Sequence, residues 1–180
     1  MHNIKDSLKV EQSQFDKQDE LYRQWFNNNP HRIDYNKYPD IQRADIDLVI
    51  KNRVGRPLKI SEKYRPYDYG DILFEIFSTY PNKHGWALES KADVLSYWFP
   101  TRVVIIDIRK VVETFERNEM GKKVWLPDQM KEPITMEIDG NIYHPYLIRA
   151  VNEGYSSISL AFKFEDLENL GIKFSVIPLG

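Results

Sequence analysis

The N-terminal part of the chain carries apolar residues at roughly helical spacing. From residue 4 to about residue 28 there is no proline or glycine, and charged residues separate the apolar ones. This pattern predicts one long amphipathic helix. The run Asn27-Asn28-Asn29-Pro30 predicts its end, because asparagine tolerates turn conformations and the residue before a proline is pushed out of the helical region.

Beyond residue 40 the apolar pattern changes to that of strands. Residues 44–50 alternate at first and then become continuously apolar, which predicts a strand whose second half is buried. Asparagine and glycine within residues 51–57 predict a tight reversal into a second strand at 58–64, and thus a hairpin. The later pattern predicts strands at 71–78, 94–99, 103–106 and a last one near 157–162, a short helix around 90–93, a helix capped by Asp107 that fades near Gly121, and a hairpin turn at Asp139-Gly140-Asn141.

Composition narrows the class of protein. The chain has 180 residues, 42% of them apolar, so it can bury a core, and no repeat or linker divides it. We therefore expect a single domain over residues 1–180. The absence of cysteine excludes disulfides and thiolate metal sites. Because there is no signal-peptide pattern and no apolar run of about 18 residues, we expect a cytoplasmic protein without a membrane partner.

Carboxylates and a lysine on the predicted hairpin are the candidate chemistry. Alternation along a strand places Ser61 and Lys63 on one face and Glu62 on the other. Asp45 and Asp47 likewise share a face of the preceding strand, so one of them is expected to meet Lys63 across the hairpin. Carboxylates can hold magnesium, which activates water for phosphodiester hydrolysis, and a lysine can orient that water or stabilise negative charge. The net charge of -2 leaves nucleic-acid binding open, since phosphate needs only a local basic face.

Two segments, Arg43-Ala44-Asp45-Ile46-Asp47-Leu48-Val49-Ile50 and Ile60-Ser61-Glu62-Lys63-Tyr64-Arg65, resemble the core of the PD-(D/E)XK nuclease superfamily. The resemblance covers residues 4–115 and leaves about 125–180 as a C-terminal extension. It implies an α/β fold with a restriction-endonuclease-like central mixed sheet, flanking helices and a long N-terminal helix. Residues 85–86, 90–93 and 103–107 resemble uncharacterised phage and bacterial members, which implies the cytoplasm of a bacterial or phage-infected host.

The resemblance implies a DNA endonuclease that depends on Mg²⁺ or Mn²⁺, with Asp47 or Asp45 as metal ligand and Lys63 assisting the water. Ser61 departs from the family pattern, because an acid is expected there and a hydroxyl is a poor magnesium ligand. Glu62 would fill the gap if the strand is bulged. Glu75 is favoured, because a carboxylate in an apolar strand needs a compensating cation or hydrogen bonds. In related nucleases the opening helix adds a glutamate, which here would be Glu20 or Glu11.

Several functions and contacts stay open at this point. Arg65, Lys91 and Tyr67 are candidates for contacts with DNA. Lys91 is better explained by a capped helix, and a solvated loop explains Tyr64, Tyr67 and Tyr69 as well as base stacking does. A homodimer or a larger protein complex is also open. The alternatives to a nuclease are an inactive nuclease-fold module that binds DNA or another protein, which Ser61 favours, and a structural domain in which Asp47 and Lys63 form an ordinary ion pair.

Overall fold

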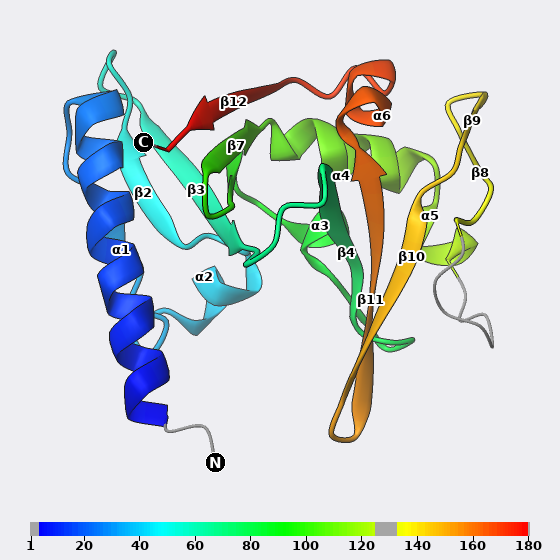
Figure 1. The fold of residues 1–180 in the computed structure, drawn as a ribbon, viewed down its shortest axis with the longest axis horizontal. Coiled ribbons are helices and arrows are strands. Elements are labelled where there is room, and N and C mark those ends of the chain that lie inside the picture. The colour runs from blue at the N-terminus through cyan, green and yellow to red at the C-terminus, as the bar shows by residue number, and fades with distance from the viewer. Residues whose placement is uncertain (1–3, 125–132, 180) are drawn as a thin grey trace.

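Two β-sheets and a long N-terminal helix form the framework of the chain (Figure 1). The computed structural model describes residues 4–124 and 133–179, with side chains described from residue 15 onward except at positions 39, 42 and 152. The larger sheet has six strands, in the spatial order β1 (His31–Arg32), β2 (Leu48–Lys51), β3 (Pro57–Tyr64), β6 (Val94–Trp98), β7 (Arg102–Ile106) and β12 (Phe174–Pro178). Since β3 and β6 run parallel and the other neighbours antiparallel, the expected α/β class with a mixed sheet is confirmed.

A second sheet contains the strand that was expected to follow the hairpin. It has four strands, in the order β10 (Tyr146–Asn152), β11 (Tyr155–Lys163), β4 (Asp71–Thr79) and β5 (Lys83–His84). The predicted strand at 71–78 is confirmed as β4, but it does not join the sheet of the hairpin. Gly70, with φ of 74°, and the preceding loop redirect the chain between β3 and β4.

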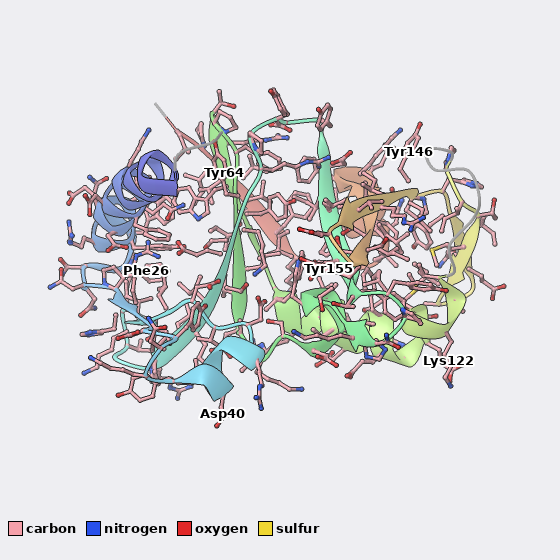
Figure 2. All side chains as sticks on the ribbon, turned by 90° about the horizontal axis from the view of Figure 1, so that it is seen from below. Phe26, Asp40, Tyr64, Lys122, Tyr146 and Tyr155 are labelled. Atoms are coloured by element: carbon pink, nitrogen blue, oxygen red, sulfur yellow. The ribbon has the colours of Figure 1, made fainter. Side chains whose placement is uncertain are left out.

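The helix α1 (Ile4–Phe26) covers one face of the larger sheet, as Figure 2 shows. Its Tyr22 is fully buried and makes a T-shaped contact with Trp98, the ring centroids lying 5.8 Å apart. Leu48, Ile50 and Ile60 complete this smaller core from the sheet. The helix predicted over residues 4–28 is therefore confirmed.

The main core lies on the other face of the larger sheet. Leu95, Tyr97 and Ile106 project into it, and they meet the second sheet together with α3 (Trp86–Glu89) and α4 (Ile108–Arg117). Phe74 of β4 lies at its centre, with its ring centroid 5.4 Å from that of Phe115. Each face of the larger sheet is thus covered by its own apolar layer, so side chains one position apart on β3 point into different surroundings.

Three predicted elements differ from the structure. The strand predicted at 44–50 begins only at Leu48, because α2 (Pro39–Arg43) precedes it and Asp45 has a left-handed backbone with φ of 54°. The short helix predicted around 90–93 is wrong: the helix is α3, and the backbone N–H groups of Lys91 and Asp93 instead donate to the carbonyls of Ala44 and Lys59. The helix capped by Asp107 is confirmed as α4, but it ends at Arg117, and α5 (Met120–Lys123) follows.

The C-terminal part supplies strands to both main sheets. The strand predicted near 157–162 is confirmed within β11, but α6 (Phe164–Asn169) and β12 follow it. The predicted turn at Asp139 and Gly140 joins the small hairpin of β8 (Met136–Ile138) and β9 (Asn141–Tyr143). Among the described residues, no helix has both the length and the apolar character needed to cross a membrane.

Candidate active site

The hairpin of β2 and β3 distributes its polar residues as alternation predicts. Ile60 lies in the core beneath α1, whereas Ser61 and Lys63 point to the opposite side. There the Lys63 Nζ lies 2.6 Å from Asp45 Oδ1, and the Ser61 hydroxyl donates to Asp45 Oδ2 over 2.7 Å. Asp45 therefore receives both side chains from β3, and it is the aspartate that meets Lys63.

Glu75 of β4 faces Asp45 and Lys63 across a shared cavity. We call this cavity of about 290 Å³ the Asp45 hollow. Its lining includes Arg43, Asp45, Lys63, Glu75, Lys83 and Trp86. The expectation that Glu75 points into the same pocket as Lys63 thus agrees with the structure, although the carboxylate arrives from the second sheet.

The surroundings of Glu75 explain how a carboxylate is accommodated in an apolar strand. Burial raises the pKa of Glu75 above its usual range, and Asp45 adds to this rise. The positive charge of Lys63 and the N–H that Trp86 donates to the carboxylate oppose it. The group therefore gives up a proton less readily than an exposed glutamate, and a nearby cation would favour its ionised form.

Gly85 and Trp86 hold this side of the hollow in place. A Cβ added at Gly85 would lie 2.6 Å from Glu75 Cγ and 2.3 Å from the Glu75 carbonyl oxygen, so only glycine fits there. Lys63 Nζ lies 5.7 Å from the centroid of the Trp86 ring, within the range of a cation–π contact. The turn before α3 thereby fixes both Glu75 and Lys63.

Asp47 does not reach the hollow. Its Oδ2 accepts the backbone N–H of Glu62 over 2.6 Å, at the point where the pairing of β2 with β3 stops, and its Oδ1 accepts a hydrogen bond from Tyr35. The Asp47 carboxylate thus takes the place of the next backbone acceptor in the hydrogen-bond ladder between β2 and β3. Of the two aspartates that the sequence left open, the one that meets Lys63 is therefore Asp45 and not Asp47.

Glu62 lies on the far side of β3, in a buried ionic network beneath α1. Its carboxylate is 2.5 Å from Arg32 and its side chain is 9% exposed, and Arg32 also pairs with Asp19 of α1 at 2.7 Å. Burial raises the pKa of Glu62, and Arg32 opposes that rise. No bulge turns Glu62 toward the hollow, because β3 pairs continuously with β6 over residues 60–64.

The remaining predicted residues do not line the Asp45 hollow. Glu20 is 57% exposed on α1 and pairs with Arg23 at 2.5 Å, and the side chain of Glu11 lies outside those described. Arg65 hydrogen-bonds Asp71, so its charge is already compensated. Lys91 and Tyr67 are exposed, Lys91 next to Ser90 at the edge of the hollow.

Two cations that no sequence pattern pointed to lie at the rim. Arg43, 80% exposed as a side chain and 3.5 Å from the exposed Asp40, and the exposed Lys83 also line the hollow. Arg43 opens the segment that resembles nuclease cores, which was its only signal in the sequence, and Lys83 had none. The hollow therefore combines Asp45 and Glu75 with the exposed cations Arg43 and Lys83, and the exposed Glu89 beside His84 also belongs to its lining. Carboxylates next to cations suit a metal ion beneath a phosphate.

A scan against protein-family models, a search of curated proteins and a search of solved structures each found no match to this chain.

Proposed function

We propose that this chain is a divalent-metal-dependent endonuclease that hydrolyses phosphodiester bonds of DNA at the Asp45 hollow, within a restriction-endonuclease-like fold. The observation that carries the proposal is the convergence of two carboxylates and one ammonium group from three separate segments. Asp45 precedes β2, Lys63 belongs to β3 and Glu75 to β4, yet all three line one cavity. The mixed sheet, its hairpin with aspartate and lysine, and the helix over its far face support the fold assignment.

The residues present fit a hard divalent cation. Mg²⁺ and Mn²⁺ prefer oxygen ligands, and Mg²⁺ usually takes only one or two carboxylates from the protein, with water and substrate phosphate completing the shell. Asp45 and Glu75 would supply those two carboxylates. Within the part of the chain that the structure describes, no group of three or more histidine or acidic residues could hold a metal, so the other ligands would come from water and phosphate.

The side chains of the hollow can then divide the work of hydrolysis. A bound metal ion lowers the pKa of water and offsets charge on the phosphate. Lys63, held by Asp45 and Trp86, is placed to donate to the attacking water or to a phosphate oxygen. Arg43 and Lys83 at the rim would attract the nucleic-acid backbone.

A second candidate function rests on Ser61. Its fully buried hydroxyl donates to Asp45, in the position where the resemblance leads us to expect an acid. With one carboxylate fewer, the same cavity would bind a metal weakly and serve an inactive module that holds DNA or another protein. Cleavage and metal binding separate this candidate from the first.

Cleavage of labelled DNA and RNA by purified protein tests the proposal. With Mg²⁺ or Mn²⁺ we expect cleavage of DNA, lost on adding a chelator, and at least about 100-fold slower with Asp45→Asn or Glu75→Gln, because each removes a metal ligand. Glu113→Gln on the exposed side of α4 is the matched control and should cleave normally. Intact DNA in all conditions, or equal rates for the wild type and both variants, would refute it.

A further inference from the structure

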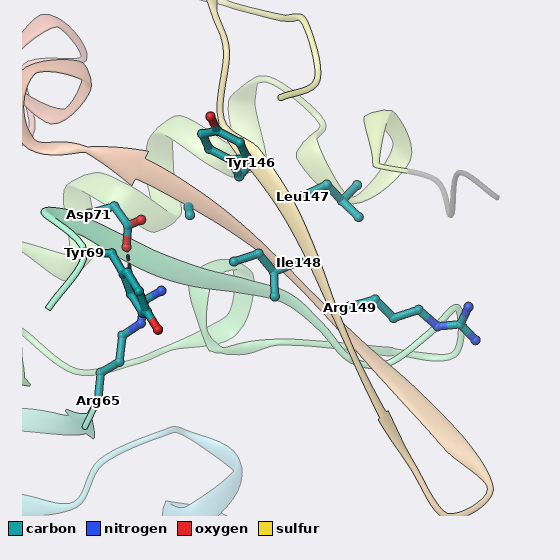
Figure 3. A pocket seen from close by; sticks show the side chains of 8 residues that line it. Arg65, Tyr69, Asp71, Tyr146, Leu147, Ile148 and Arg149 are labelled. Atoms are coloured by element: carbon teal, nitrogen blue, oxygen red, sulfur yellow. Dashed lines mark hydrogen bonds and ion pairs between the residues drawn. The ribbon is translucent and has the colours of Figure 1, made fainter. Parts of the chain in front are cut away.

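A second cavity lies on the second sheet, which also supplies Glu75 to the Asp45 hollow. This cavity of about 390 Å³, which we call the Tyr69 hollow, falls in the size range of small-molecule sites. Its lining includes Arg65, Tyr69, Asp71, Tyr146, Ile148 and Ala161. Figure 3 shows Arg65, Tyr69 and Asp71 at the β3–β4 connection and Tyr146 and Ile148 on strand β10. Nothing in the proposed hydrolysis uses it.

The strand register of the second sheet places Glu75 and the floor of the Tyr69 hollow on the same face. Residues directly opposite each other on neighbouring strands share a face, and Ile148 pairs with Ser159, which pairs with Glu75. The next row on that face consists of Tyr146, Ala161 and Leu73. The floor of the Tyr69 hollow and the Glu75 carboxylate are therefore parts of one continuous sheet face. Ala161 lies one strand and two residues from Glu75, roughly 8 Å, and Ile148 lies two strands away, roughly 10 Å.

Two exposed tyrosines stand at the sides of the Tyr69 hollow. Tyr69 is 66% exposed and Tyr146 is 45% exposed, although both adjoin apolar surface. The guanidinium of Arg65 lies 4.8 Å from the centroid of the Tyr69 ring and is itself hydrogen-bonded to Asp71. The Tyr69 ring is thus held by a neighbour on one side before any ligand binds.

The charges around the Tyr69 hollow argue against a phosphate as its occupant. Asp71 compensates Arg65. Arg149 also belongs to the lining, but its side chain points away from the cavity in Figure 3 and donates from Nε to Ser156 over 2.9 Å. An apolar floor between exposed aromatic rings suits a flat, weakly polar group instead, as in proteins that stack nucleobases on tyrosine.

We propose that the Tyr69 hollow is a nucleobase subsite, which stacks a base of the nucleotide next to the phosphate held in the Asp45 hollow. This inference rests on the proposed function and narrows its substrate to a strand that is unpaired at this point. A base inside a duplex is stacked and paired, so it cannot enter the cavity unless it leaves the helix. Phosphate recognition stays with Lys63, Arg43 and Lys83, and base recognition falls to Tyr69 and Tyr146.

Binding of a labelled single-stranded oligodeoxynucleotide, compared with an abasic strand of equal phosphate count, tests the subsite. Fluorescence anisotropy in Ca²⁺, used in place of Mg²⁺ to slow hydrolysis, gives both dissociation constants. We expect the strand with bases to bind about 5- to 100-fold more tightly, because stacking on an aromatic side chain contributes about that factor. The double variant Tyr69→Ala with Tyr146→Ala should lose the preference and keep the weak abasic binding.

The matched control is Tyr155→Ala, a similarly exposed tyrosine near the far turn of the β10–β11 hairpin. It should keep the wild-type preference. Equal affinity of the wild type for both strands, as expected if the cavity serves a protein partner, overturns the inference, and so does a preference that survives the double variant.

Cleavage in Mg²⁺, measured in parallel, separates the two proposals. If the base preference depends on both tyrosines but no variant or wild-type protein cleaves, the subsite stands and the nuclease proposal fails. If Asp45→Asn abolishes cleavage while bases give no advantage in binding, the nuclease proposal stands and the subsite fails.

Discussion

Neighbouring charged residues on the two sides of β3 lie in opposite kinds of surroundings. Glu62 is almost fully buried beneath α1, where Arg32 pairs with both Glu62 and Asp19. Lys63, the next residue, lies in a cavity with exposed cations at its rim and two carboxylates inside. Burial of charge on the first side fixes the helix on the sheet, whereas incomplete compensation on the second leaves capacity for a ligand.

The largest difference between the two sides should appear when the neighbours are substituted one at a time. Lys63→Met should slow DNA cleavage about 100- to 1,000-fold, as loss of a preorganised donor does, while the unfolding free energy changes little. Glu62→Gln should keep the rate per folded molecule. Kinetic assays with a parallel urea titration measure both quantities, and slow cleavage by a stably folded Glu62→Gln protein would contradict the separation.

Arg32→Met tests the side of β3 beneath α1, because it leaves Glu62 and Asp19 without their cation. We expect a loss of about 3 kcal/mol in unfolding free energy at neutral pH, because breaking a buried ion pair leaves a buried charge without its partner. The loss should be smaller in acid, because Glu62 has a raised folded-state pKa and its protonation removes the unpaired negative charge. Arg23→Met, which breaks a half-exposed pair on the same helix, should cost less than about 1 kcal/mol. A loss of the same size for both variants at all pH values would argue against a buried network.

Gly85→Ala perturbs the Asp45 hollow on the other side of β3 through a change in the backbone. The added methyl group would overlap Glu75, so β4 and the turn before α3 must separate. We expect a loss of about 1 to 3 kcal/mol in stability together with slower cleavage. Gly121→Ala, where the nearest atom belongs to the side chain of His84 at 3.1 Å, should be milder. Unchanged cleavage by Gly85→Ala would show that Glu75 need not be held in place.

The pH dependence of metal binding should give the smallest effect. The folded-state pKa of Glu75 is raised, so protons compete with the cation at pH values above the ordinary glutamate range. Mn²⁺ affinity should therefore fall as the pH is lowered toward that raised pKa, and the same group lowers stability slightly as the pH rises through the window between its unfolded and folded values. A calorimetric series across pH measures this, and an affinity that stays constant down to the ordinary pKa would speak against Glu75 as a ligand.

Local pattern was sufficient to predict the hairpin and the faces of β3. Ser61 and Lys63 share a side because strand geometry alone decides it. The choice between Asp45 and Asp47 was beyond the sequence, because it depends on a left-handed residue after α2 and on a carboxylate that replaces a ladder bond. Both are consequences of tertiary contacts.

The role of Glu75 could be predicted from the sequence only in part. The cost of a charge in an apolar strand indicated that Glu75 needed partners, and the structure supplies Lys63 and the Trp86 N–H. The pattern of residues 71–78 did not predict that β4 belongs to the second sheet, because an apolar strand fits either sheet. Arg43 and Lys83 became visible only once the cavity between the sheets was formed.

Titration of Mn²⁺ into four proteins by calorimetry tests the central claim most directly. If Asp45 and Glu75 together hold a hard cation, the wild type and Asp47→Asn should bind with similar affinity, while Asp45→Asn and Glu75→Gln should bind at least about 10-fold more weakly. Binding that disappears with Asp47→Asn but persists in the other two variants would contradict the account, as would a wild type that binds no Mn²⁺.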